Sequence, residues 1–274
     1  MGSVNLATKF STKVAERFSM GSLTDAYAGK DYDFSGVKSI KIYSVDVVDL
    51  TDYTRSGGDR FGSLVELGDT VQEMTMAKDR AFTFTIDKGN AVQQYNIKAA
   101  TKSLKREIDE KVTPEIDIYR MKKWADGKGL TKVDASLTKS NVLEAIMTGS
   151  MEMNNALVPK KNRALFIKES IYLQCKLADQ IVGVDSLGEK AITNGAVGMI
   201  DQMKVVPVPD SYFPENTNFI IKYKGCTVDP VQLKPYRILT EQRGVDGDVV
   251  EGRIIYDSFV LTARNKGIFT STTE

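Results

Sequence analysis

Apolar residues near the start of the chain recur at every fourth position, which is the spacing of one helix face. They are Leu6, Phe10, Val14 and Phe18, and this spacing predicts an amphipathic helix over residues 5–20. In the next segment, up to residue 36, isolated apolar anchors stand among Gly, Ser and Asp, which predicts an extended arm. Two interpretations stay open: the helix folds on its own domain, or the arm docks on a neighbouring subunit.

Period-two alternation begins after Val37 and predicts a long β-hairpin. Apolar positions alternate from Ile40 to Val47 and again from Phe82 to Ile86. Between these runs lies a glycine-rich, charged turn, residues 55–62. A ten-residue strand spans about 33 Å, and a two-stranded hairpin alone is marginal in water. The hairpin therefore needs a surface to lie on, which a neighbouring copy could supply.

The rest of the chain predicts mixed helices and strands. A helix over 91–110 restarts at Pro114 and runs to Trp124, because proline fits the first turn of a helix. Further predicted elements are helices over 141–154 and 168–179, strands over 163–168, 203–209, 219–223 and 253–261, a short turn or helix over 229–236 and a glycine-acidic loop over 243–251. The order lacks a regular β-α-β rhythm, so the predicted class is α+β.

Composition removes several classes of function. The 274 residues contain no His, which excludes Ser-His-Asp triads, Cys-His pairs and histidine-ligated metals. The net charge is +1, so the sequence does not predict dedicated DNA binding by phosphate neutralisation. Cys175 and Cys226 lie far apart and are predicted to be buried thiols in a reducing compartment. No signal peptide or membrane-spanning run is apparent, so synthesis and retention in the cytoplasm are expected.

The sequence contains no motif that predicts a catalytic, cofactor-binding or metal-binding residue. No glycine loop has the spacing that would cradle a phosphate, and the acidic stretch 246–251 lacks the periodicity of a calcium loop. Glu115 and Asp117 are two residues apart on a predicted helix and should point to different faces. A carboxylate-based enzyme, such as a glycosidase, remains an alternative, but it would need two facing acids and no such pair is apparent.

The order of these elements resembles that of tailed-bacteriophage major capsid proteins, which have the Hong Kong 97 phage-type capsid fold that encapsulins share. The resemblance covers most of the chain. Its residues are FSGVKSIKIYSV (34–45), DYTRSGG (52–58), RAFTFTIDKGN (80–90, taken as the return of the hairpin), VTPEIDIYRMKKWADGKG (112–129), ALVPKKNRALFI (156–167), GAVGMIDQMKVVPVPDSYFPENTNFII (195–221) and EGRIIYDSFVL (251–261).

The resemblance implies a division of the chain. Its parts would be an N-terminal arm (1–36), an E-loop hairpin (37–86), a spine helix and peripheral domain (87–129), an axial domain (130–242), and a return strand to the peripheral domain with a C-terminal tail (243–274). The implied function is structural. Pentamers and hexamers would close into an icosahedral head around double-stranded DNA, in a virion assembled in the bacterial host cytoplasm, without cofactor, metal or membrane.

The remaining expectations concern contacts between subunits. The candidates at the hairpin tip are Arg55, Asp59, Arg60 and Phe61, and those of the arm are Leu6, Phe10, Val14 and Phe18. A separate scaffolding protein and a portal are further implied partners, and DNA contacts would not be sequence-specific. The alternative within the fold is an encapsulin shell. Some members of the family join subunits through an isopeptide bond from an E-loop lysine, but the stretch from Ile42 to Ala77 contains no lysine.

Overall fold

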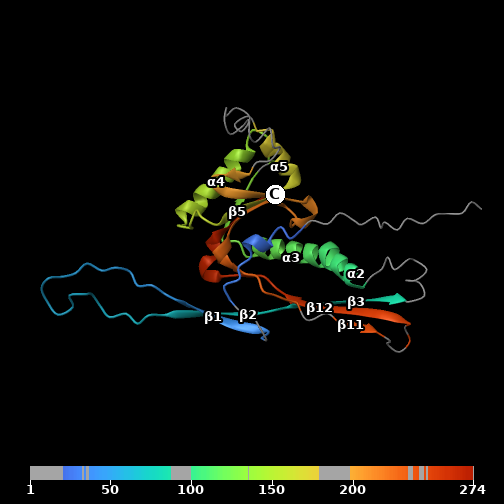
Figure 1. The fold of residues 1–274 in the computed structure, drawn as a ribbon. Coiled ribbons are helices and arrows are strands. Elements are labelled where there is room, and N and C mark those ends of the chain that lie inside the picture. Colours follow the sequence, from blue (N-terminus) through green and yellow to red (C-terminus); the bar gives the residue numbers. More distant parts are fainter. Residues whose placement is uncertain are drawn as a thin grey trace, which may run out of the picture.

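The computed structural model describes residues 21–32, 34, 37–87, 100–134, 136–178, 198–233, 237–240, 244 and 246–273. These residues form two larger sheets with a long helix between them, a small two-stranded sheet, and a hairpin that extends far beyond the larger sheets (Figure 1). Helices and sheets are both present, and most strand pairs are antiparallel. The α+β class is therefore confirmed.

The larger sheet has six strands in the order β4 (Leu130–Val133), β14 (Ile268–Thr272), β8 (Thr217–Tyr223), β5 (Arg163–Lys168), β7 (Met203–Val208) and β6 (Met199–Ile200). The pairs β4–β14 and β5–β7 are parallel. Helices α4 (Val142–Asn155) and α5 (Glu169–Lys176) pack against one face. Its central strands β5 and β8 are buried along their length without alternation, because both faces of the sheet are covered.

The spine of the molecule is a continuous helix in three parts. It consists of α2 (Ala100–Glu107), a π-helical turn η2 (Ile108–Val112) and α3 (Thr113–Asp126). Pro114 lies in the first turn of α3, as the sequence predicts. Met121 and Trp124 pack against the second face of the six-stranded sheet together with Phe166 and Ile220. The spine therefore closes the core that α4 and α5 close from the other side.

The smaller sheet has β12 (Gly247–Tyr256) at its centre, with β3 (Lys78–Asp87) along one side and β10 (Val231–Leu233) and β11 (Arg237–Thr240) along the other. Three expectations are corrected here. The run 80–90 is not the return of the hairpin, because β3 pairs with β12 along its whole length. The predicted turn or helix over 229–236 contains β10, and the predicted loop over 243–251 contains the start of β12. Period two shows which face a strand buries but not which strand it pairs with.

The hairpin itself pairs β1 (Ser39–Val45) with β2 (Asp69–Thr75), from Ser39 opposite Thr75 to Val45 opposite Asp69. Residues 46–68 form the long loop between them. The remaining short elements are η1 (Asp25–Tyr27), η3 (Asp210–Tyr212), η4 (Lys224–Cys226), β9 (Thr227–Val228), β13 (Phe259–Val260) and η5 (Thr262–Gly267).

Most elements of the second half follow the sequence. The predicted helices over 141–154 and 168–179 correspond to α4 and α5, and the strands over 163–168, 203–209 and 219–223 to β5, β7 and β8. Both cysteines are buried and free, as predicted, and burial raises the pKa of the Cys175 thiol to about 12 and that of Cys226 to about 11. The expected C-terminal tail is instead partly a core strand, because β14 lies between β4 and β8.

Candidate subunit interface

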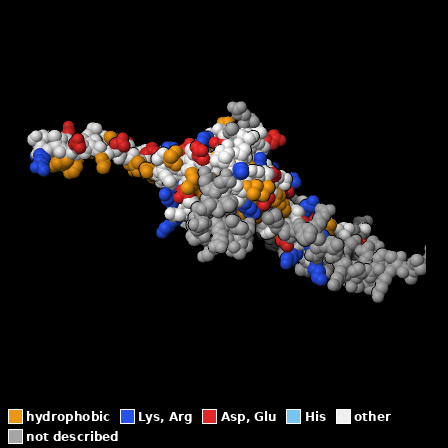
Figure 2. Space-filling model, turned by 90° about the horizontal axis from the view of Figure 1, so that it is seen from above, with side chains coloured by type: hydrophobic (Ala, Val, Ile, Leu, Met, Phe, Trp, Pro, Cys, Tyr) orange, Lys and Arg blue, Asp and Glu red, His pale blue; other side chains and the backbone are white. Residues whose placement is uncertain are grey.

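The loop of residues 46–68 projects from the body as a thin arm (Figure 1). Its side chains include many apolar groups that water reaches, and they line the projection in Figure 2. Leu50 and Leu64 are as exposed as in an extended chain, at 102% and 104%. The other exposed apolar side chains of the loop are Val47, Val48, Tyr53, Phe61, Val65 and Leu67. Large apolar side chains that are exposed in such number on one projecting segment are typical of a site that another protein covers.

The tip of the loop has an ordered local structure although it projects into solvent. The Thr54 amide donates a hydrogen bond to the Arg60 carbonyl (3.0 Å), and the Arg60 side chain donates to the Gly57 carbonyl (3.1 Å). The rings of Tyr53 and Phe61 meet edge to face with centroids 5.0 Å apart. Gly57 has a φ of 98°, a conformation that glycine adopts without strain. The tip is thus partly preorganised for a partner.

All four candidates of the tip lie on its surface. Arg55, Asp59, Arg60 and Phe61 are exposed, and Phe61 is exposed by 83%. Their contact with another subunit stays a prediction. The candidates of the arm, Leu6, Phe10, Val14 and Phe18, lie outside the described residues.

At its base the hairpin is fixed to the body by a small apolar cluster. Met74 and Met76 are buried there with Phe34, Val228 and Leu261. The Ala77 amide, just beyond β2, donates to the Asp257 carboxylate (2.8 Å), which also accepts a hydrogen bond from the Tyr119 hydroxyl of the spine (2.9 Å). The base of the hairpin is therefore packed on the body, whereas the loop of residues 46–68 projects from it.

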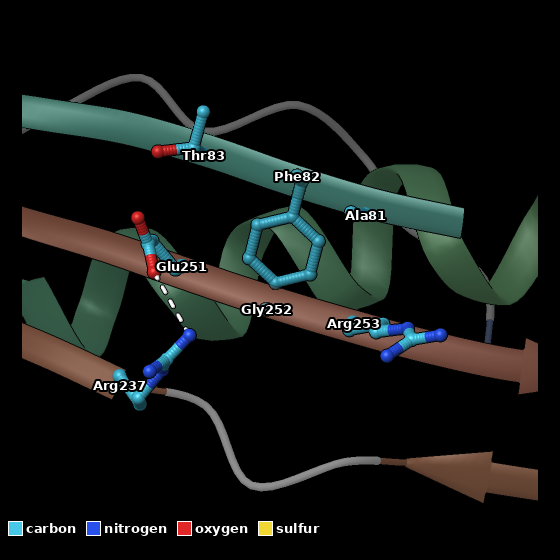
Figure 3. Close-up of a pocket in the computed structure, with 7 residues that line it drawn as sticks. All are labelled: Ala81, Phe82, Thr83, Arg237, Glu251, Gly252 and Arg253. Atoms are coloured by element: carbon cyan, nitrogen blue, oxygen red, sulfur yellow. Dashed lines mark ion pairs between the residues drawn. The ribbon is translucent and has the colours of Figure 1, made fainter. Parts of the chain in front are cut away.

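A groove of about 620 Å³ lies on the smaller sheet and is lined by residues of β3, β11 and β12 (Figure 3). The side chain of Phe82 crosses Gly252, where a Cβ atom would come within 2.2 Å of the ring. Glu251 pairs with Arg237 (3.5 Å), and Arg253 pairs with Asp79 (2.5 Å). Among the described residues that line the groove, Glu251 is the one acid, so these residues do not form the two facing carboxylates of a glycosidase.

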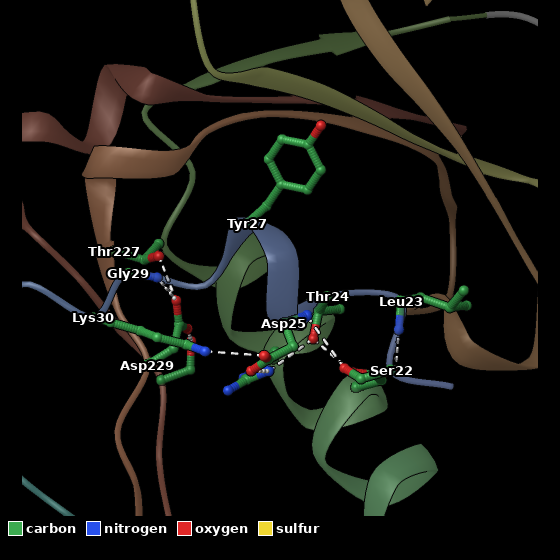
Figure 4. Close-up of polar contacts among 12 residues, drawn as sticks. Ser22, Leu23, Thr24, Asp25, Tyr27, Gly29, Lys30, Thr227 and Asp229 are labelled. Carbon is green, nitrogen blue, oxygen red and sulfur yellow. Dashed lines mark hydrogen bonds and ion pairs between the residues drawn. The ribbon is translucent and has the colours of Figure 1, made fainter. Parts of the chain in front are cut away.

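A second polar site joins the segment Ser22–Gly29 to the spine (Figure 4). Asp117 of α3 is 1% exposed and accepts hydrogen bonds from the Leu23 amide (2.8 Å) and the Ser22 (2.9 Å) and Thr24 (2.5 Å) hydroxyls. Arg120, one turn later, donates to the Thr24 hydroxyl (3.0 Å). Glu115 instead pairs with Arg80 (3.0 Å). The two acids thus serve different faces of α3, as their spacing predicts.

Asp229 fixes the other end of the same segment. This buried carboxylate accepts hydrogen bonds from the Gly29 amide (2.9 Å), the Trp124 indole (3.0 Å) and the Ser258 hydroxyl (2.5 Å). Lys222 lies beside it, with its ammonium 4.4 Å from the Trp124 ring centroid and 2.6 Å from the Tyr27 carbonyl oxygen that accepts its hydrogen bond. Burial lowers the pKa of Lys222. These contacts join the segment Ser22–Gly29, the spine and Ser258 in one buried polar network.

These contacts revise the predicted limit of the arm at residue 36. Thr24 and Ala28 have no exposed surface, and Leu23 and Tyr27 pack against the core of the spine. Phe34 belongs to the cluster at the hairpin base. Residues 22–34 therefore belong to the subunit body, so far as the structure describes them, and a separate arm would consist of the residues before Gly21. No feature of the sequence indicates this, since isolated apolar residues in a polar segment are compatible with either arrangement.

The described residues contain no group of three or more Cys, Asp or Glu side chains arranged to hold a metal ion. Among the same residues, no helix has both the length and the apolar composition needed to cross a membrane.

The sequence matches no protein-family model, and it matches no curated protein. Solved structures do match. The capsid of cyanophage P-SCSP1u superposes with a TM-score of 0.79 at 10% identity, over 98% of this chain and 93% of that one. The mature capsid of bacteriophage PhiM1 gives a TM-score of 0.75 at 10% identity, over 98% of this chain and 92% of that one. The capsid of the myovirus XM1 gives a TM-score of 0.63 at 12% identity over the full length of both chains.

The similarity extends over nearly the whole chain, which includes the projecting hairpin, the spine helix and both sheets. Because the sequence identities are low, the structures share the arrangement of their helices and strands and little of their amino-acid sequence. This chain therefore has the Hong Kong 97-type fold of phage capsid proteins, as the resemblance in the sequence indicates.

Proposed function

We propose that this protein is the major capsid protein of a tailed bacteriophage. Its copies form pentamers and hexamers that close into an icosahedral head around double-stranded DNA, and assembly takes place in the cytoplasm of the bacterial host. The observation that carries the proposal is the loop of residues 46–68, whose apolar side chains the subunit leaves exposed, on a fold that phage capsids share. A second copy supplies the surface that this loop needs.

The geometry suits a ring of identical subunits. The loop and the body surface that receives it are different parts of the chain, so the contact is head-to-tail and can close into rings. In the described part of the chain, the loop is joined to the body at β1 and β2, so its direction can differ between rings of five and six. A separate scaffolding protein, a portal and contacts with DNA that ignore its sequence complete the proposed set of partners.

Negative-stain electron microscopy and light scattering test this function on the purified protein. We expect closed shells, or rings that precede them, without added metal or cofactor. An empty shell of uniform size is compatible with both a phage capsid and an encapsulin. Co-expression with the neighbouring genes separates the two: portal and terminase genes support a phage capsid, whereas a gene for a cargo enzyme supports an encapsulin. A monomer of 30.3 kDa at all protein and salt concentrations would contradict the proposal.

We also expect the shell to be free of isopeptide bonds from the hairpin. No lysine occurs between Ile42 and Ala77. Lys41 pairs with Glu73 (3.8 Å) and Lys78 lies over the Tyr119 ring (5.3 Å), so both belong to the base of the hairpin. Arginine stays protonated and is a poor nucleophile, so Arg55 and Arg60 are no substitute. Boiled and reduced shells should run as one monomer band in a denaturing gel, whereas a ladder of multimers would place a reactive lysine elsewhere.

A further inference from the structure

Gln72 lies on β2 at the place where the hairpin leaves the subunit body. It shares the body-facing side of β2 with Met74, and it pairs across the hairpin with Ile42. Beyond it, Thr70 and Asp69 of the same strand are exposed, as is Val45 on β1. Among the described residues, Gln72 is therefore the last side chain of β2 that hydrogen-bonds to the body before the loop of residues 46–68 begins.

The amide of Gln72 holds two backbone groups at once. Its Nε2 donates to the Val260 carbonyl (2.9 Å), and its Oε1 accepts from the Thr262 amide (2.9 Å). Between these two residues, Leu261 is buried in the cluster at the hairpin base, and its own amide donates to the Cys226 carbonyl (3.0 Å). The segment 260–262 is thus fixed to the body on one side and to the hairpin on the other. Only a side chain with both a donor and an acceptor can make this pair of bonds.

The surroundings of this contact leave room for the hairpin to move. A groove of about 430 Å³ runs between the hairpin and the segment 261–264, and Gln72 is among the residues that line it. The tip lies thirteen residues from Gln72, which corresponds to about 40 Å of extended chain. A rotation of about 5° at Gln72 would therefore displace the tip by about 3.5 Å, roughly the rise of one strand residue. A small change at this point moves the tip to a different register on its partner.

We propose that the Gln72 clamp sets the angle at which the hairpin leaves the body, and that this angle selects the curvature of the assembled shell. The second half of this inference rests on the proposed function, whereas the first half concerns the isolated subunit. Gln72 is a positioning residue in this scheme, since it touches the subunit's own backbone and leaves the contact with the neighbour to the tip.

The test for the subunit measures the angle directly. Spin labels are placed on Cys introduced at the tip (Ser56→Cys) and on the body (Lys161→Cys), both exposed positions, while the two native cysteines are buried. The distance between the two labels is measured by double electron–electron resonance, in labelled protein diluted tenfold with unlabelled protein. Gln72→Ala should make the distribution of this distance at least twice as wide. Glu73→Ala, on the opposite face of the same strand, should leave it unchanged and serves as the matched control.

Gln72→Asn provides a second variant if Gln72→Ala does not fold, because it keeps the amide but is too short to reach both groups. An unchanged width in a folded Gln72 variant would overturn the clamp. The test for the shell is the particle diameter in negative stain. We expect Gln72 variants to give mixed diameters or open sheets while Glu73→Ala gives the wild-type size. If the wild type forms no shells, the proposed function fails, and the distance measurement still decides the clamp.

Discussion

Replacement of Asp229 by alanine should remove about 3 to 5 kcal/mol from the free energy of unfolding, the cost of breaking a buried charged network. The substitution leaves the Gly29 amide, the Trp124 indole and the Ser258 hydroxyl without the acceptor that they share. It also deprives the buried Lys222 of the nearest charge that favours its ammonium form. Asp229→Asn should also destabilise the fold, but by less than Asp229→Ala. The asparagine keeps the volume of the side chain, but its amide NH₂ replaces one carboxylate oxygen and then faces hydrogen-bond donors.

Urea unfolding followed by tryptophan fluorescence is the appropriate measurement. Trp124 is the single tryptophan of the chain and donates to Asp229, so the signal reports on this site. Asp126→Ala, at the exposed end of the same helix, is the control and should change stability by no more than about 0.5 kcal/mol. If Asp229→Ala unfolds at the same urea concentration as the wild type, this carboxylate does not hold the segment Ser22–Gly29.

The double substitution Leu50→Ser with Leu64→Ser should abolish assembly and leave the subunit as stable as the wild type. Both leucines are fully exposed in the isolated subunit, so their loss costs the fold nothing. If a neighbouring copy buries them, each contributes about 1.5 to 3 kcal/mol to the contact. Together they contribute about 3 to 6 kcal/mol, and because 1.4 kcal/mol is a factor of ten in an equilibrium constant, the protein concentration needed for assembly should rise by at least about 100-fold.

The measurement is sedimentation of shells across a concentration series, beside the unfolding midpoint of the same samples. Ser63→Ala, an exposed polar position of the same loop, is the matched control and should assemble normally. Replacement of residues 47–67 by Asn-Gly goes further, because the bond from the Asp46 amide to the Gly68 carbonyl (3.0 Å) already brings the ends of the loop together. Normal assembly by either variant would show that the loop is not the interface.

The loop of residues 46–68 and the site around Asp229 differ in how far the sequence predicts them. The loop could be predicted, because alternating apolar residues around a glycine-rich turn describe a hairpin with too little chain around it to cover both faces. Asp229 could not, because an isolated aspartate before a proline is most often part of an exposed turn. Its role depends on donors from Gly29, Trp124 and Ser258, which lie far apart in the chain. Gln72 is similar, since its partners are backbone groups about 190 residues away.

The sequence alone determined the helix and strand character of α3, α4, β5, β7 and β8, the projecting loop, and the absence of histidine chemistry, because these follow from local periodicity and composition. Only the tertiary structure decided which strands pair. It paired β3 with β12 instead of with the hairpin, inserted β14 between β4 and β8 in the six-stranded sheet, and made the described residues of the range 22–34 part of the body. The physical reason is that strand pairing and buried polar networks join residues distant in the chain, and local periodicity carries no information about the partner.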